Sequence, residues 1–537
     1  MSNPFSAAIA NRQVKSLLFL FGAFVLALFF TNWIVEGKLG GWSLEVLGLA
    51  AGVIVLSILA NWRMGLYLFL AWLIFEDLAR KFMGNNMLIY FSKDALVAIV
   101  YLAFLFARKR RSVAFFRPPF WVALMLFAWL GLLQVANPNS PSIFYGFLGV
   151  KLYFYYIPLM FLGYALICSE EDLRRFLLFN LAIATVVALL GVIQATVGTD
   201  FLSPRELAPE LRPLGQLTRT APISRARITA PTAVFVSTGR FGWYVILMFI
   251  LGLGAVSRQL LSPLGRTGKL VLLGVGTIFL AAVMSASRGC IVYCVASVLV
   301  MGIGMLWGGP LTERGRIRLR KSLFRSALVI ALVFSFMMVF FPEAISGRLA
   351  FYYETLALSS PNSELVYRIR DYPGANFLQV FNYPEWPLGY GIGTGSLGVQ
   401  YVVRILGAPA PSAPVIENGY GTLILEMGIP GPILWILWTT ALVFCGWRVV
   451  KRLKRTSLFP VAFAILWFSF LLLFPFTYGG IQPYQNYILN AYFWLLVGVL
   501  FRLPSLVPGP QVASSVPVRQ EQNVYLPRNR SLNECAE

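Results

Sequence analysis

Two short stretches of the sequence place polar side chains beside apolar runs in a way that suggests chemistry. Glu417 and Asn418 stand directly before the apolar stretch that begins GYGTLILEM, and Arg288 lies in the sequence SASRG between two apolar runs. A carboxylate can take a proton from a hydroxyl group, and an arginine can donate paired hydrogen bonds to phosphate oxygens. The chain contains no histidine. A proton transfer here would therefore fall to another side chain.

The elements that must position these residues are predicted to be membrane helices. The 537 residues are 58% hydrophobic and 12% charged, whereas soluble domains have about 25% charged residues. Apolar runs long enough to span a bilayer recur along the chain, and backbone groups in lipid are satisfied within helices. We predict an all-α, polytopic integral membrane protein with about 12–14 transmembrane helices. The predicted spans are 17–35, 42–60, 64–75, 88–106, 120–136, 150–167, 176–197, 241–257, 270–286, 289–307, 327–341, 418–447, 459–476 and 487–502.

Charge and cysteine content limit the possible partners. The net charge is +22, but the basic residues punctuate apolar spans, so membrane lipids explain them and we expect no nucleic-acid partner. The first apolar run lacks a cleavage pattern and is read as a first span. The five cysteines show neither a paired framework nor metal-ligand spacing. We therefore predict no metal and no other cofactor.

Basic residues in the connections predict the orientation. Clusters at 108–111, 314–325 and 448–455 fall on the same side as the N-terminus, which is then cytoplasmic. Residues 1–502 are predicted to form a single transmembrane domain with two long periplasmic loops, 198–240 and 342–416. The remaining residues, 503–537, are predicted to be a disordered cytoplasmic tail.

Both predicted outer loops contain arginine, which opposes the usual inside preference. Because arginine matches phosphate oxygens two at a time, this distribution suggests a lipid-linked phosphate or diphosphate. Binding of anionic headgroups or pairing with nearby acidic residues is the simpler reading, and we favour it for Arg205, Arg212, Arg219, Arg370 and Arg404. Arg288 is different, because a charge held between two helices is costly unless it is used.

Three motifs in this order resemble the O-antigen ligase and O-antigen polymerase superfamily of bacterial membrane glycosyltransferases. They are SASRG at 285–289, the loop stretches SSPNSELVYRIR and PLGYGIGTGSLG at 359–370 and 387–398, and ENGYGTLILEMGIPG at 417–431. The segment RARITAPTAVFVSTGRFGWY, 225–244, is similar to the arginine segment upstream of a span in that family. The resemblance covers about residues 225–450 and implies transfer or polymerisation of a glycan from a polyprenyl-diphosphate (undecaprenyl diphosphate) carrier. It implies the inner membrane of a bacterium and a saccharide or lipid acceptor.

The resemblance also assigns site residues. It implies that Arg227, Arg288 and Arg368 bind the diphosphate, with Arg348 assisting. Where the family commonly has histidine before asparagine, this chain has Glu417, which can act as a base but cannot donate hydrogen bonds while ionised. Glu417 and Asn418 are then the catalytic pair in a metal-independent, inverting transfer. Alternatively, both residues only support the start of a helix, or the chain is a divergent or inactive paralogue.

The glycine-rich and acidic residues near this pair have alternative readings. The PLGYGIGTGSLG stretch lacks the ending of a phosphate-binding loop, so we expect it to shape a tight loop that roofs the site. Pro430 is expected to break the helix around Gly428–Gly431. Glu426 is either a functional intramembrane carboxylate or a partner for an arginine.

Two other classes of protein fit parts of the pattern. A transporter or flippase for a lipid-linked saccharide also needs many spans and arginines for a diphosphate, although we find no inverted repeat. A metal-dependent membrane glycosyltransferase would use acidic residues in an outer loop. Glu76 and Asp77 could serve in that class, but their simplest reading is solvated charges at a helix end.

Overall fold

The structure is a computed structural model of the chain, and it is almost entirely helical. Contacts between Cα atoms divide the chain into two compact units, described here separately. Unit 1 comprises residues 1–112, 202–215 and 234–236, and unit 2 comprises residues 113–201, 216–233 and 237–537. The structure describes residues 52–110, 116–198, 200–204, 211, 218–260, 265–310, 335, 338–357, 359–360, 363–365, 367–396, 398–412, 415–479 and 483–507.

The described part of unit 1 includes the helices α3 (Trp62–Phe82) and α4 (Met87–Arg110). Asn61 begins α3 by accepting hydrogen bonds from the amides of Arg63 and Met64, as an N-cap residue does. The helices pack against each other, and the facing apolar side chains of α3, such as Leu66 and Phe69, are fully buried.

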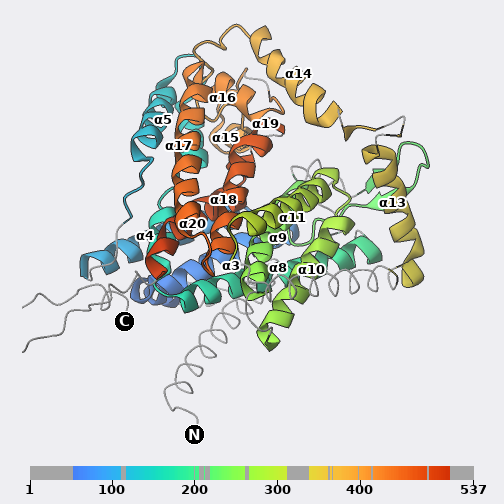
Figure 1. Cartoon of the computed structure of the whole chain (residues 1–537). Coiled ribbons are helices and arrows are strands. Elements are labelled where there is room, and N and C mark those ends of the chain that lie inside the picture. Colours follow the sequence, from blue (N-terminus) through green and yellow to red (C-terminus); the bar gives the residue numbers. More distant parts are fainter. Residues whose placement is uncertain are drawn as a thin grey trace, which may run out of the picture. The chain divides into compact units, whose positions relative to one another are not determined.

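Unit 2 contains the remaining helices and the only strands among the described residues. Figure 1 shows α9, α10 and α11 side by side, and α17 beside α5 and α16. The helices before the first long connection are α5 (Trp121–Leu133), α6 (Ile143–Phe154), α7 (Leu159–Leu166) and α8 (Glu170–Val197), with the 3-10 turn η1 (Gln134–Ala136) after α5. The later long helices are α9 (Thr238–Leu260), α10 (Arg266–Met284), α11 (Arg288–Gly308), α17 (Pro430–Arg452), α18 (Phe459–Leu471) and α20 (Tyr487–Arg502).

Shorter elements fill the connections. The first connection contains the strands β1 (Thr218–Thr220) and β2 (Arg227–Thr229). The second contains α13 (Pro342–Leu356), the π-helical turn η3 (Tyr367–Asp371), α14 (Tyr372–Leu378), η4 (Gln379–Asn382) and α15 (Val399–Leu406), and ends at α16 (Gly419–Met427). The short elements near the C-terminus are η5 (Leu472–Phe476), α19 (Thr477–Gly479), η6 (Pro483–Gln485) and η7 (Leu503–Leu506).

Nine helices of the described part of the chain are long and apolar enough to cross a membrane. This confirms the predicted all-α, multi-pass membrane architecture. The predicted spans 17–35 and, for the most part, 42–60 and 327–341 lie outside the described residues. The run 64–75 is part of α3, which is not one of the nine, and 120–136 forms a shorter apolar helix. The nine are Met87–Lys109, Ile143–Leu166, Glu170–Val197, Thr238–Gln259, Thr267–Met284, Arg288–Gly308, Pro430–Arg452, Phe459–Gly479 and Tyr487–Leu506.

Glycines allow two helices of unit 2 to touch through their backbones. A Cβ atom on Gly163 of α7 would lie 2.1 Å from the carbonyl oxygen of Leu495, and one on Gly498 of α20 would lie 2.0 Å from that of Met160. Small residues at such positions let membrane helices approach closely, which strengthens van der Waals packing in the absence of a hydrophobic effect between them. Gly163 and Gly498 therefore allow the close contact between α7 and α20.

The predicted helix break around Gly428–Gly431 is confirmed. Helix α16 ends at Met427, Gly428 has a φ of 70°, and α17 begins with Pro430 at its first position. A positive φ suits glycine, and proline is preorganised for a helix start where no amide donor is needed. The break therefore divides the predicted span 418–447 into a short helix and a membrane helix.

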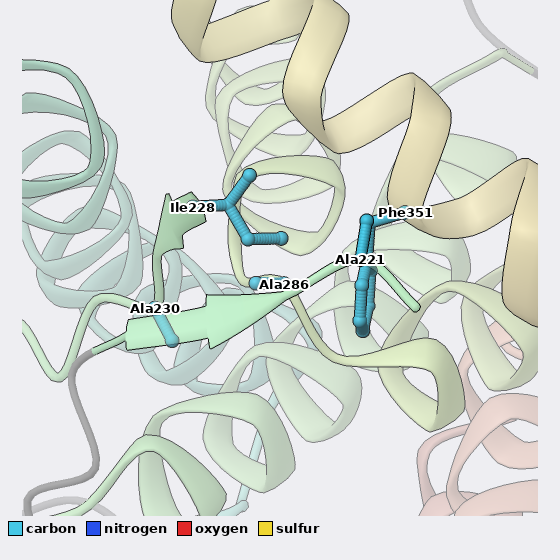
Figure 2. Close-up of a cluster of buried hydrophobic side chains, with 5 residues drawn as sticks. All are labelled: Ala221, Ile228, Ala230, Ala286 and Phe351. Atoms are coloured by element: carbon cyan, nitrogen blue, oxygen red, sulfur yellow. The ribbon is translucent and has the colours of Figure 1, made fainter. Parts of the chain in front are cut away.

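The two long connections of unit 2 fold together. β1 and β2 form an antiparallel hairpin, and Figure 2 shows Ala221, Ile228 and Ala230 of the hairpin region gathered with Ala286 and Phe351. Phe351 belongs to α13, and Ala286 to the turn between α10 and α11. This buried cluster joins the hairpin, the turn and α13 at one end of the helices.

Candidate functional site

The hairpin determines which arginine of the first connection faces the rest of the site. Arg219 lies opposite Ile228 in the register, and Thr220 lies opposite Arg227. Opposed residues share a face of the hairpin and neighbours along a strand alternate. Ile228 is buried in the cluster of Figure 2, so Arg219 shares the inner face, and Arg227 points to the other face and is exposed.

The turn of the hairpin is held by α13. The carboxylate of Glu354 accepts hydrogen bonds from the amides of Ile223 at 2.7 Å and Ser224 at 3.0 Å. These two bonds hold the exposed turn of the hairpin against α13. Glu354 therefore fixes the hairpin, and Arg219 with it, relative to α13.

The SASRG motif forms a tight turn that starts α11 with Arg288. Ala286 has a φ of 54°, and Ser287 caps the helix by accepting a hydrogen bond from the amide of Cys290. The guanidinium carbon of Arg288 lies 5.6 Å from the ring centroid of Phe351, within the range of a cation–π contact. Its side chain is 19% exposed. Arg288 is thus held at the end of a membrane helix with its charged group still accessible.

Glu364 brings two arginines together. Its Oε2 atom lies 2.7 Å from a guanidinium nitrogen of Arg288 and 3.2 Å from Nε of Arg368. Arg368 is one helical turn after Glu364, whereas Arg288 is contributed by the α10–α11 turn. We call Arg219, Arg288, Arg368 and Glu364 the arginine cluster.

Arg219, on the inner face of the hairpin, lies within electrostatic range of these charges. Burial lowers the pKa of the Arg219 guanidinium, and the positive charges of Arg288 and Arg368 lower it further. Burial acts to raise the pKa of Glu364, but hydrogen bonds and charge from Arg288 and Arg368 outweigh it and hold that pKa below its usual value. Among the described residues, the cluster therefore has three positive charges and one negative charge.

Tyr372 links the arginine cluster to Glu417. The guanidinium carbon of Arg368 lies 4.7 Å from the centroid of the Tyr372 ring, and the Tyr372 hydroxyl donates a hydrogen bond to the Glu417 carboxylate. Glu417 is exposed, so its second oxygen can meet a substrate. The Glu417 carboxylate and the arginine cluster are thus connected through one aromatic side chain.

Asn418 is the buried N-cap of α16. Its Oδ1 accepts a hydrogen bond from the amide of Gly421 at 2.9 Å, and its Nδ2 donates to the carbonyls of Pro373 and Tyr478, both at 3.0 Å. The helix-cap alternative is therefore realised in the structure. The bond to Pro373 places the start of α14, including Tyr372, next to Glu417.

Arg348 points into the protein. Its side chain is buried, and its guanidinium donates to the carbonyls of Met284, Ala195 and Thr229 at 3.2, 3.2 and 2.6 Å. Burial lowers the pKa of this group to about 10. The structure therefore places Arg348 as a support that ties α13 to the ends of α8 and α10 and to β2, and not within the arginine cluster.

The glycine-rich stretch is buried against α6 and the far end of α16. Gly389, Gly391 and Gly393 all have positive φ, and a Cβ atom on Gly393 would lie 2.3 Å from the carbonyl oxygen of Tyr145. The amide of Gly395 donates to Glu426 at 3.1 Å. The expected tight loop is present, but it packs beside Glu426, at the end of α16 opposite to Glu417.

Glu426 has protein partners of a kind that was not predicted. Its carboxylate, which is fully buried, accepts a hydrogen bond from the Tyr153 hydroxyl at 2.6 Å, and Tyr153 in turn accepts one from Tyr484 at 2.7 Å. The anticipated arginine partner is replaced by two tyrosines and a loop amide. Glu426 therefore acts in the structure as an anchor for the glycine-rich loop.

In unit 1, the two acidic residues that could hold a metal, Glu76 and Asp77, form ion pairs with basic side chains. Glu76 and Asp77 are fully buried, which corrects the expectation of solvated charges at a helix end. Arg80 lies 2.9 Å from Asp77 and 3.6 Å from Glu76, and Lys93 lies 3.5 Å from Glu76. No group of three or more potential metal-ligating side chains occurs among the residues that the structure describes.

Sequence reasoning missed three members of the site. The sequence predicts headgroup binding or pairing for Arg219 and does not single out Glu364 among the acidic residues near these arginines, and no sequence signal marks Tyr372. The alternation of TRT and RIT around a short turn could have separated Arg219 from Arg227. The spacing of Glu364 and Arg368 is that of a helical ion pair. Arg370 pairs with Asp371 at 2.7 Å, as the simpler reading predicted.

The arrangement can bind an anion and accept a proton at neighbouring positions. Three guanidinium groups offer paired donors for phosphate oxygens, and Glu417 offers a carboxylate that is accessible to a hydroxyl group. In comparisons with known proteins, the chain matches no family model and has no significant match among curated proteins.

Proposed function

We propose that this membrane protein is a glycosyltransferase of the O-antigen ligase and polymerase type. It transfers or polymerises a glycan carried on a polyprenyl diphosphate, such as undecaprenyl diphosphate, to a saccharide or lipid acceptor. The observation that carries the proposal is the pairing of Arg288 and Arg368 through Glu364, with Arg368 linked by Tyr372 to Glu417. The order of the SASRG, glycine-rich and ENGYG motifs supports it.

In this mechanism the arginine cluster stabilises the leaving diphosphate. The acceptor oxygen attacks the anomeric carbon of the donor sugar and forms the new glycosidic bond, while the bond from that carbon to the phosphate oxygen breaks. The electron pair of the broken bond stays on the diphosphate, where fixed guanidinium groups stabilise the developing charge without reorganisation. Displacement in one step inverts the anomeric carbon.

Glu417 receives the proton of the attacking hydroxyl group. It can do so because its carboxylate is exposed, while the hydrogen bond from Tyr372 restrains its orientation. Asn418 supports this geometry from the helix N-cap. The guanidinium groups stabilise the negative charge on the leaving diphosphate, which is the role that a metal ion has in other transferases. The proposed reaction is therefore metal-independent.

The position of the site in the chain supports a lipid-linked donor. Arg288 is the first residue of a candidate membrane helix, so a diphosphate bound there lies near the end of a span. We place this end on the periplasmic face of a bacterial inner membrane, with both chain termini in the cytoplasm, because the basic connections 108–111, 314–325 and 448–455 are then cytoplasmic.

The test is glycan transfer by the purified full-length protein in nanodiscs, using undecaprenyl-diphosphate-linked glycan as donor. Arg288→Ala should reduce kcat by about 100- to 1,000-fold, as expected for loss of one group that stabilises transition-state charge. Arg227→Ala is the control, because this exposed arginine lies on the face of the hairpin opposite to Arg219, and it should retain normal activity. Equal activity of the Arg288→Ala variant and the unmodified protein would reject the proposal.

A flippase for a lipid-linked saccharide is the other candidate that the arginine cluster favours. Such a protein would bind the same diphosphate and would move it across a vesicle membrane without forming a glycosidic bond. Transport of labelled lipid without transfer, lost in Arg288→Ala, would favour the flippase. The exposed carboxylate of Glu417 beside the cluster favours transfer, because transport needs no base.

A further inference from the structure

Glu364 has a position that the proposed reaction does not explain. Its carboxylate contacts the guanidinium groups of Arg288 and Arg368, which the reaction needs for the diphosphate. A residue that only held these side chains in place could do so with a neutral hydrogen-bond acceptor. A negative charge at this point instead lowers the net positive charge that a bound anion meets.

The donor and the product of the proposed reaction differ in charge at the diphosphate. In the glycosylated donor both phosphates are esterified, so the diphosphate has a charge of about −2 at neutral pH, since the remaining oxygens are strongly acidic. After transfer, the terminal phosphate gains an ionisable oxygen with a pKa of about 6, and the charge becomes about −3.

The described cluster meets these two charges differently. Glu364 contacts both Arg288 and Arg368, so its negative charge offsets part of the positive charge that a bound diphosphate meets there. The side chains of Arg288, Arg368 and Glu364 are 19%, 47% and 39% exposed, so that solvent screens the charges only in part. The product brings one more negative charge toward the Glu364 carboxylate than the donor does, and is therefore repelled more strongly.

We propose that Glu364 is a specificity-determining residue that disfavours the diphosphate product relative to the glycosylated donor and thereby promotes product release. The inference rests on the proposed function, because it assigns the ligand of the arginine cluster to a diphosphate. Glu364 holds Arg288 and Arg368 together in the unliganded protein, and its charge then opposes retention of the trianionic product.

The experiment compares two synthetic lipids that differ in this one charge. They are undecaprenyl diphosphate and undecaprenyl diphosphate esterified with methanol on its terminal phosphate. Their affinities are measured by native mass spectrometry for the full-length protein, for Glu364→Gln and for Glu343→Gln. Glu343 is an exposed residue in the first turn of α13, so its variant removes the same charge outside the cluster.

Glu364→Gln should bind undecaprenyl diphosphate about tenfold more tightly, and its methyl ester only about twofold more tightly. Glu343→Gln should change neither affinity. Glu364→Asp, which restores the charge, should restore the discrimination, and this separates a charge effect from loosening of the cluster. In transfer assays, Glu364→Gln should show stronger inhibition by undecaprenyl diphosphate.

Two results would overturn the inference in different ways. In the first, the unmodified protein binds the lipids, and Glu364→Gln changes the affinities for both lipids equally, weakens both or leaves both unchanged. This result would reject only the role of Glu364. Failure of the unmodified protein to bind either lipid, with Arg288→Ala equally inactive in binding, would reject the inference together with the proposed function.

Discussion

Two clusters of charged side chains, one in each unit, differ in charge balance and in burial. In unit 1, Glu76 and Asp77 pair with Arg80 and Lys93, and all four side chains are almost completely buried. We call these four residues the α3–α4 charge cluster. Within these four residues two negative charges face two positive charges, and the neighbouring buried Lys81 also interacts electrostatically with Asp77. The arginine cluster of unit 2 has three positive charges and one negative charge and is partly exposed.

The difference shows which buried charges in a membrane protein already have their partners within the protein. A buried charge is tolerated when partners compensate it, because removing ions from water costs several kcal/mol each. The α3–α4 charge cluster meets this condition within the protein. The described residues of the arginine cluster retain an excess positive charge, and an anionic ligand would complete it. The net charge of a cluster and the burial of its side chains are therefore better indicators of a ligand site than the presence of arginine.

The largest expected effect comes from unbalancing the buried cluster. Replacing Arg80 with Met leaves Glu76 and Asp77 short of positive charge in a buried site and should destabilise the protein by about 3–5 kcal/mol. Thermal unfolding of the purified protein in nanodiscs measures this change. An unchanged melting temperature would show that the cluster is not compensated as described.

The next effect concerns Arg348, which resembles the buried cluster more than the arginine cluster. Arg348→Met removes the donors for the carbonyls of Met284, Ala195 and Thr229. Leaving buried carbonyls without donors should reduce the free energy of unfolding by about 3 kcal/mol. Binding of undecaprenyl diphosphate, measured on the folded fraction, should stay near normal. A selective loss of binding with full stability would place Arg348 in the ligand site instead.

Glu417→Gln tests chemistry at the exposed end of the site. The amide oxygen can still accept the hydrogen bond from Tyr372, but the side chain can no longer take a proton. We expect kcat for glycan transfer to fall by about 100-fold, while the melting temperature and donor affinity are unchanged. Normal turnover would leave Glu417 with a structural role at the start of α16.

The smallest expected effect separates the two contacts of Tyr372. Tyr372→Phe keeps the ring beneath Arg368 and removes the hydroxyl bond to Glu417, so kcat should fall by about tenfold with unchanged donor affinity. Tyr372→Leu also removes the cation–π contact and should weaken binding of undecaprenyl diphosphate by a further two- to fivefold, or about 0.5–1 kcal/mol. Identical kinetics for both variants would contradict this division.

Much of the membrane architecture could be predicted because it depends on local sequence. Apolar run length places α8, α11 and α20, and Pro430 places the break before α17. The glycine-rich stretch also forms a tight loop as expected, because its positive φ values require glycine. These features follow from the residues themselves and need no knowledge of distant contacts.

The composition of the site depends on how distant segments meet, which sequence spacing does not specify. Arg219 and Arg227 are equivalent by position in the first connection, and only the register of the hairpin puts one on each face. Arg348 was expected near a ligand because the docking of α13 onto α8 and α10 is not encoded in any local pattern. Glu364 gains its importance from Arg288, which lies far away in the sequence.

The amide of Asn418 has a consequence for how mutational scans of this protein are interpreted. Its three hydrogen bonds reach Gly421, Pro373 and Tyr478, so a single side chain holds three separate chain segments. Even the isosteric replacement by aspartate removes both donors at once. Loss of activity on substitution of Asn418 is therefore expected from misplacement of these three segments, and a chemical role is better tested at neighbours with a single contact, such as Glu417.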